Sequence, residues 1–199
     1  TFQYTLEEHI PELPFNVIIK FGEYPQMQQD LDNGVLDLII TPQKGSQKNL
    51  LYDAFSKERI VLVAGKNTET GFLQQWLKEG KFQEATQFLK QQLWYSTAGD
   101  MEHLKNFWLK NFGEHPDFRP NYIVPNISSI LRCLSNANGF SIVPDFLCKE
   151  AIENKKVKMV WQGIQPLENT LYFGKRKNTI YHHELDQLED IFKQKWETK

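Results

Sequence analysis

The residues best suited to binding a ligand open a predicted helix at residues 126–138. The sequence there reads NISSILRCLSNAN, and Ile127, Ile130 and Leu134 recur at the helical period. Asn126 is a suitable N-cap because its side-chain oxygen can accept a hydrogen bond from a free backbone N–H of the first turn. The N-terminal N–H groups of such a helix could hold a small anion if they face an opening. These residue types are suited to non-covalent binding of a small anion.

Two further sites combine hydroxyl side chains with the end of a predicted strand. Thr41 follows the apolar run at residues 35–40, and ligands of open α/β sheets lie beyond the carboxyl ends of the strands. The Thr41 hydroxyl could therefore contact a ligand; the alternative is an ordinary turn residue. Ser96 and Thr97 open a strand-to-helix turn that could hold an anion or a polar ligand, although a charged Asp100 would repel an anion there.

The sequence lacks the patterns typical of an enzyme or a metal site. The five histidines show neither HExxH nor HxH spacing, and the adjacent side chains of His182-His183-Glu184 would point apart on a helix. There is no GxSxG motif, no phosphate-binding glycine loop and no CxxC pair. Cys133 and Cys148 lie in apolar helical patterns, which favours two buried reduced thiols over a redox switch. The sequence predicts no enzyme, no metal and no cofactor.

Composition excludes several other classes. The chain has 199 residues, 40% hydrophobic and 24% charged, which is ordinary for a soluble globular protein. A net charge of −2 with dispersed Lys and Arg argues against direct binding of nucleic acid. The run Lys175-Arg176-Lys177 is interpreted as a solvated turn, with a phosphate or DNA contact as the alternative. No apolar run is long enough to span a membrane, and the N-terminus does not resemble a signal peptide, so we expect a cytoplasmic protein with no membrane contact.

The elements that position these residues alternate between strands and helices. A strand at 16–21 (NVIIKF), a helix at 24–33 and a strand at 35–40 (VLDLII) predict a parallel βαβ unit in a helix-covered sheet. Two further strands are predicted at 51–55 and 59–64, and Gly65-Lys66-Asn67 is interpreted as a crossing between two halves. The remaining prediction places helices at 68–80, 82–92, 101–112, 126–138, 145–154 and 181–196, strands at 93–95, 119–124, 140–143, 156–161 and 169–174, and a second linker at 163–168.

Four stretches, in a fixed order, point to a known family. They are LDNGVLDLIIT at 31–41, KERIVLVAGKN at 57–67, NISSILRCLSNANGFSIVP at 126–144 and LYFGKRKN at 171–178. Together they resemble the effector-binding domain of bacterial LysR-type transcriptional regulators. The resemblance implies an α/β, type 2 periplasmic-binding-protein-like fold of two Rossmann-like subdomains joined by two crossing strands. Residues 1–66 and 165–199 would form subdomain I, and residues 67–164 would form subdomain II.

The resemblance also implies a site and partners. A small metabolite would bind in the cleft between the subdomains, and the ligand-facing positions would be Thr41, Pro42, Ser96, Thr97, Asn126 and Ser128. Members of the family usually form head-to-tail dimers, which here would set residues 16–21 and 24–33 against residues 119–124 and 126–138 of a partner. DNA would be bound only through an N-terminal domain that this chain does not contain. The family's first strand, and the start of the helix after it, are not recognisable upstream of Glu7.

Two functional hypotheses follow from these observations. The first is a sensor domain whose small-molecule effector, a carboxylate by the chemistry of the candidate residues, shifts a conformational or dimer equilibrium and so alters DNA binding. The second is a free periplasmic-type solute-binding protein, which shares the fold and would require export. The sequence favours the sensor.

Overall fold

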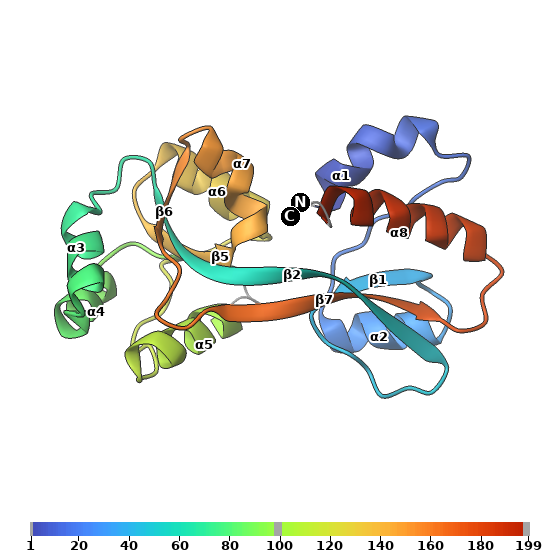
Figure 1. Ribbon diagram of the computed structural model, residues 1–199, viewed down its shortest axis with the longest axis horizontal. Coiled ribbons are helices and arrows are strands. Elements are labelled where there is room, and N and C mark those ends of the chain that lie inside the picture. Colours follow the sequence, from blue (N-terminus) through green and yellow to red (C-terminus); the bar gives the residue numbers. More distant parts are fainter. Residues whose placement is uncertain (1, 98–100, 197–199) are drawn as a thin grey trace. The chain divides into compact units, whose positions relative to one another are not determined.

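The chain forms two compact units, and each contains β-strands and its own helices (Figure 1). The computed structural model describes residues 2–97 and 101–196. Unit 1 comprises Thr1–Glu58 and Asn169–Lys199, and unit 2 comprises Arg59–Glu168. The predicted boundaries, after residue 66 and before residue 165, differ from these because the chain changes unit inside strands instead of at turns.

The elements alternate much as the sequence predicts. Unit 1 contains α1 (Phe2–His9), the 3-10 helix η1 (Ile10–Glu12), α2 (Tyr24–Asp32), β1 (Leu38–Thr41) and α8 (His182–Trp196). Unit 2 contains α3 (Gly71–Glu79), α4 (Phe82–Lys90), β3 (Tyr95–Ser96), α5 (Met101–Phe112), β4 (Tyr122–Ile123), α6 (Ile127–Asn136), β5 (Phe140–Pro144), α7 (Asp145–Glu153) and β6 (Val157–Trp161). The strands β2 (Leu50–Gly65) and β7 (Leu167–Arg176) belong partly to each unit.

In unit 1, helices cover both faces of a small sheet. Strand β1 pairs with β7 in antiparallel register, and β7 neighbours β2. Helix α2 lies on one face, where Leu31 and Ile39 are buried, while α1 and α8 lie on the other (Figure 1). On that second face Phe173 stacks on Phe55 with ring centroids 3.8 Å apart and contacts Phe192 of α8 at 5.9 Å. This packing holds α8 against the sheet, and α1 lies against α8.

Two of the three cations in the run at 175–177 are bound inside unit 1. Lys175 pairs with the buried Glu189 of α8, with Nζ and Oε1 2.6 Å apart. The guanidinium of Arg176 donates to the Leu31 carbonyl at 2.7 Å and to the Asp37 carboxylate at 2.8 Å, which ties β7 to the end of α2. These two side chains therefore stabilise the fold, which neither alternative for the run anticipated, and only Lys177 is fully solvent-exposed.

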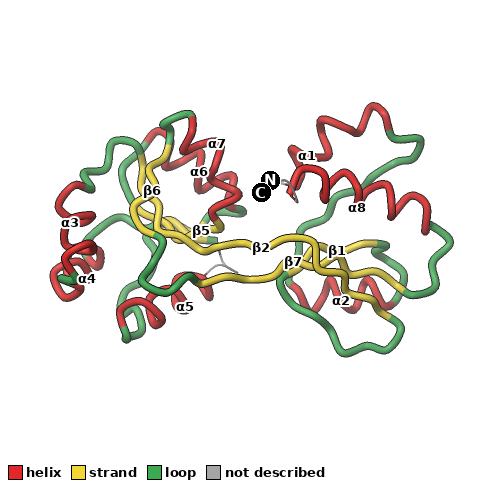
Figure 2. Tube along the Cα trace, in the orientation of Figure 1, coloured by secondary structure: helices red, strands yellow, loops and turns green. Residues whose placement is uncertain are grey.

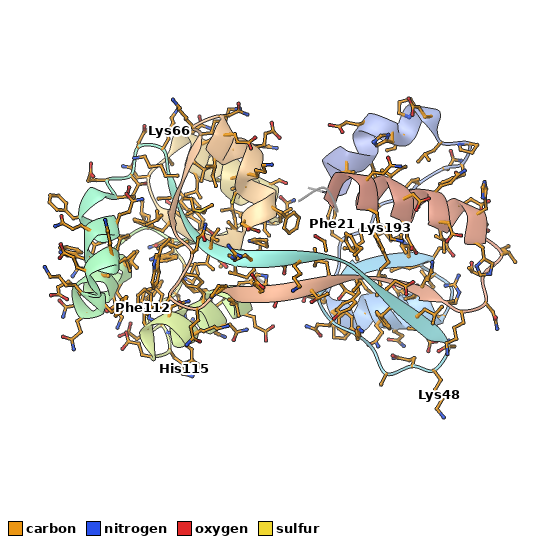
Figure 3. All side chains as sticks on the ribbon, in the orientation of Figure 1. Phe21, Lys48, Lys66, Phe112, His115 and Lys193 are labelled. Atoms are coloured by element: carbon orange, nitrogen blue, oxygen red, sulfur yellow. The ribbon has the colours of Figure 1, made fainter. Side chains whose placement is uncertain are left out.

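The prediction of a strand at residues 16–21 is wrong, and with it the parallel βαβ unit. This segment, between η1 and α2, is drawn as a loop in Figure 2. Its apolar side chains face solvent, with Ile18 82% and Phe21 76% exposed; Phe21 is labelled in Figure 3. A β-rich run forms a strand only beside a hydrogen-bonded neighbour. Within the described residues β1 pairs only with β7, and that pair is antiparallel.

The two strands predicted at 51–55 and 59–64 are a single strand, β2, which Figure 2 shows without interruption. Residues 56–58 contain no glycine or proline, so nothing local ends the strand. The chain passes from unit 1 to unit 2 between Glu58 and Arg59. Within unit 1, Asn169 donates to Glu58 at 2.8 Å, and within unit 2, Arg59 pairs with Glu168 at 3.0 Å. Polar pairs therefore flank both crossing points.

Unit 2 has a sheet of β5, β2 and β6 with a different core on each face. Strand β2 pairs antiparallel with β5 on one side and with β6 on the other. Because side chains alternate along a strand, Val61 and Val63 face the helices α6 and α7, whereas Ile60 and Leu62 face the aromatic core under α3, α4 and α5. The largest fully buried side chains of that aromatic core are Trp94, Trp108, Phe107 and Phe140. Among the described residues, no helix has the length and apolar character needed to cross a bilayer.

The helix, turn and strand predicted around residues 126–147 are confirmed. Asn126 caps α6 by accepting a hydrogen bond from the Ser129 backbone N–H at 2.9 Å. Gly139 follows this helix with a positive φ of +128°, but the C-cap of α6 is Ala137, so the glycine does not itself end the helix. A Cβ there would lie 2.7 Å from the Tyr95 ring and 2.9 Å from the Leu93 carbonyl oxygen. Glycine is required because two strands approach closely.

Candidate functional site

Four of the six predicted ligand-binding residues lie together in unit 2, where β3 and β4 end. These short strands pair in parallel, with Ser96 opposite Ile123. The Val124 backbone N–H then donates to the Ser96 carbonyl at 2.9 Å, and the chain turns into α6 at Asn126. Because parallel strands end at the same edge of a sheet, the end of β3 at Ser96 and the first turn of α6 are neighbours. The predicted residues are thus brought together by backbone pairing.

The first turn of α6 offers a set of hydrogen-bond donors. The Asn126 carboxamide oxygen accepts from the Ser129 backbone N–H at 2.9 Å and from the Ser129 hydroxyl at 3.1 Å. That leaves the carboxamide NH2 as the group with which Asn126 could bind a ligand. Helix geometry leaves the backbone N–H groups of Ile127 and Ser128 without an intrahelical acceptor, and Ser128 is half-buried. Donors on a positive helix terminus favour an anion.

Strand β3 is fixed by contacts of Tyr95, the residue before Ser96. The Ser141 hydroxyl of β5 donates to the Tyr95 carbonyl at 2.8 Å, and the Tyr95 and Tyr122 rings stack with centroids 5.1 Å apart. The Ser96 hydroxyl donates to the Thr97 carbonyl at 3.0 Å, so its oxygen is best placed to accept from a ligand. Both Ser96 and Thr97 are buried, and Asp100 lies outside the described residues.

The other two predicted residues, Thr41 and Pro42, belong to unit 1. Thr41 is the last residue of β1 and is 1% exposed, whereas Pro42 is exposed. The Thr41 hydroxyl oxygen accepts from the Gln43 backbone N–H at 3.1 Å, which is the geometry of a turn residue. Its hydroxyl hydrogen would be the group available to a ligand. The turn interpretation is therefore satisfied, and a ligand contact by Thr41 stays a prediction.

Lys44 is a nearby cation that sequence reasoning passed over. Its Nζ lies 4.6 Å from the centroid of the Tyr172 ring, and Tyr172 is the β7 residue paired with Thr41. A lysine in a polar loop carries no sequence signal that separates it from an ordinary surface residue. The structure places it above the residue that pairs with a predicted ligand contact.

Burial shifts the pKa of two titratable groups in unit 2. Burial raises the pKa of the Cys148 thiol to about 12, which keeps it protonated and unreactive. Burial also raises the pKa of Tyr95 beneath the candidate site. In the described ranges no group of three or more His, Cys, Asp or Glu could hold a metal ion. His182 and His183 are exposed at the start of α8.

Comparison with known proteins identifies the family. The model of the LysR substrate binding domain matches residues 6–197. No curated protein matches the chain. Among solved structures, the C-terminal domains of a LysR family protein from Agrobacterium tumefaciens are similar with a TM-score of 0.71 and 12% identity, over 97% of this chain and 88% of that chain.

Two further structures are similar at low identity. The regulatory domain of CcmR from Synechocystis, in complex with 2-PG, has a TM-score of 0.64 and 15% identity, over 95% of this chain and 89% of that chain. Full-length LysG from Corynebacterium glutamicum has a TM-score of 0.66 and 12% identity, over 97% of this chain and 61% of that chain. These likenesses confirm the type 2 periplasmic-binding-protein-like fold.

The family match decides between the two functional hypotheses. It extends over nearly all of the chain, from residue 6 to residue 197, and it supports the sensor over a free solute-binding protein. Domains of this kind bind small-molecule effectors and form part of oligomeric, DNA-binding regulators. The chain belongs to the LysR substrate binding domain family, the effector-binding regulatory domains of LysR-type transcription regulators.

Proposed function

We propose that this domain senses a small metabolite carrying a carboxylate, which binds at the first turn of α6 and the end of β3. The observation that carries the proposal is the parallel pairing of β3 with β4, which puts Ser96 and Thr97 beside Asn126 and Ser128. The donors there are two backbone N–H groups, one carboxamide and one hydroxyl, on a positive helix terminus. Thr41 and Pro42 would supply further contacts from unit 1.

The mechanism is differential binding without covalent chemistry. The effector would bind one conformation of the domain more tightly than another, and the population would shift by that difference in affinity. LysR-type regulators are not a family of enzymes, and this supports a regulatory domain that binds its ligand without converting it.

Isothermal titration with a panel of small mono- and dicarboxylates tests this proposal. Saturable binding is expected, and analysis of the recovered ligand should show no turnover. Ser128→Ala removes one donor while leaving the Asn126 cap in place, so affinity for the bound carboxylate should fall by ~0.5–1.5 kcal/mol, roughly two- to tenfold. Ser135→Ala is the matched control, because the Ser135 hydroxyl donates to the Leu131 carbonyl near the other end of the same helix.

Either of two results would count against the proposal. If no carboxylate binds, the ligand class is wrong. If a carboxylate binds and Ser128→Ala weakens it no more than Ser135→Ala does, the ligand lies elsewhere on the domain.

The proposal extends to assembly and location. We expect a homodimer or tetramer in which residues 16–21 and α2 of one copy meet β4 and α6 of another. Both surfaces expose apolar side chains, among them Phe21 at 76% and Tyr122 at 51%. DNA would be contacted only through an N-terminal domain outside this chain, and a regulator of transcription would act in the cytoplasm without a membrane partner.

A further inference from the structure

Asn111, near the C-terminal end of α5, makes contacts that a helix does not need. It is 4% exposed, and its carboxamide NH2 donates to the Phe107 carbonyl at 2.9 Å. Its carboxamide oxygen accepts from the backbone N–H groups of Ile164 at 2.8 Å and Gln165 at 3.4 Å. A buried amide is costly unless it is satisfied. Here the partners of the oxygen lie on the segment 162–168, which follows β6 and includes Leu167 and Glu168, the first two residues of β7.

The segment is fitted closely to the end of α5. Gly163 has φ +87°, and a Cβ there would lie 2.5 Å from the Asn111 carboxamide oxygen. Glycine is therefore required by both the backbone conformation and the available space. Lys110 adds a second link, because its Nζ donates to the Pro166 carbonyl at 2.8 Å. The path of the segment is set by α5.

Strand β2 holds the same segment at its two ends. The Arg59 guanidinium donates to the Gln162 side chain at 3.3 Å and to the Glu168 carboxylate at 3.0 Å. Strand β7 begins at Leu167, and the chain leaves unit 2 between Glu168 and Asn169. The segment therefore anchors the start of β7 within unit 2.

Helix α5 follows the Ser96 and Thr97 part of the candidate ligand site in the chain, and it ends at this segment. It begins at Met101, shortly after Thr97 in the chain, and ends at Phe112, next to Asn111. Its 12 residues span about 18 Å as a single rigid helix. In a rigid helix, a shift of the first turn would also move Asn111, and the coupling test below measures this.

We propose that Asn111 is a positioning residue that couples α5 to the crossing strand β7. A displacement of α5 moves segment 162–168 through Asn111 and changes the direction in which β7 enters unit 1. The trigger, a ligand beside Ser96 and Thr97, rests on the proposed function, whereas the positioning role does not. A merely structural Asn111 would support the stability of unit 2 without affecting the orientation of the units.

The positioning role can be measured without any effector. Spin labels on Lys48→Cys in unit 1 and His115→Cys in unit 2, both exposed and labelled in Figure 3, report the distance between units by double electron–electron resonance. Cys133→Ser removes the half-buried thiol, and Cys148 is buried. Asn111→Ala should shift or broaden the distance distribution of the full chain. Asn136→Ala is the control, because the Asn136 carboxamide NH2 also donates to the carbonyl four residues earlier, that of Arg132 at 3.1 Å, but on α6 instead of α5.

Each outcome decides the positioning role. A distribution for Asn111→Ala that superimposes on the parent, or an equal change in Asn136→Ala, overturns it. If circular dichroism shows that Asn111→Ala does not fold, the exposed Lys110→Ala takes its place, with a smaller broadening expected and an unchanged distribution overturning the proposal. A failed carboxylate titration would leave this result intact, so the two failures are distinguishable.

The coupling along α5 has its own test. In amide NMR spectra, Thr97→Val should shift the signals of Ile164 and Gln165 in the parent chain and should leave them unmoved when Asn111→Ala is also present. Absence of a shift in the parent overturns the coupling. Shifts of equal size in both backgrounds show that the path does not pass through Asn111, which overturns it as well.

Discussion

At the scale of single residues, the two cysteines differ in burial, which limits the access of reagents to a thiol. Cys148 is fully buried between α7 and the sheet, and burial raises its pKa to about 12. Cys133 is half-buried on α6. Because the thiolate is the reactive species, the two should react very differently.

We predict that iodoacetamide at mildly alkaline pH modifies Cys133 and spares Cys148 in the folded chain. Peptide mass spectrometry measures the two sites separately, and alkylation in denaturant, where both should be modified, is the control. Equal modification of both cysteines in the native protein would mean that α7 opens readily. The predicted pair of reduced thiols is present, although only one of them is fully buried.

At the scale of elements, the turn between α6 and β5 tests why a glycine is needed there. Gly139→Ala introduces a Cβ at φ +128° and 2.9 Å from the Leu93 carbonyl oxygen. The backbone conformation and the clash together should lower the free energy of unfolding by at least about 2 kcal/mol. Gly113→Ala is the matched control: its φ is +74°, with nothing within 4 Å, so only the conformational cost of ~1–2 kcal/mol applies.

Urea unfolding of both variants measures the difference. Equal destabilisation would show that Leu93 and Tyr95 move aside to accept a Cβ, which would leave the positive φ as the reason for a glycine at position 139.

The elements that the sequence predicts well are those whose signal is local. The structure reproduces the bounds of α5, and it places α6 within the predicted range with its Asn126 cap. Residues 16–21 and the join in β2 were mispredicted because strand formation depends on a neighbour far away in the sequence. The same holds for the residues to which a function is assigned. Asn126 is recognisable from the sequence as an N-cap. Lys44 and Asn111 are recognised only from structural contacts, Lys44 with Tyr172 of β7 and Asn111 with segment 162–168.

At the scale of the whole molecule, the unpaired segment 16–21 reports on assembly. Its amides lie outside any helix or strand, with Ile18 82% exposed, so they should exchange rapidly with solvent in a dilute monomer. If the proposed dimer forms over this segment, its exchange should slow as protein concentration rises, while exchange in β5, buried in unit 2, stays constant. Hydrogen–deuterium exchange at several concentrations measures both. If sedimentation shows that the sample is dimeric and exchange in segment 16–21 does not slow, the dimer contact lies elsewhere.

The uninterrupted course of β2 also limits how the chain can change in length. Side chains alternate between faces along a strand, so one residue inserted at 56–58 would exchange the two faces of the part of β2 that follows. Val61 and Val63 would then lie where Ile60 and Leu62 now pack, and both cores of unit 2 would be mismatched at once. An insertion of two residues would restore the alternation but displace the pairing with β5 and β6. The loop at 43–49, which has no such register, should accept either insertion at little cost.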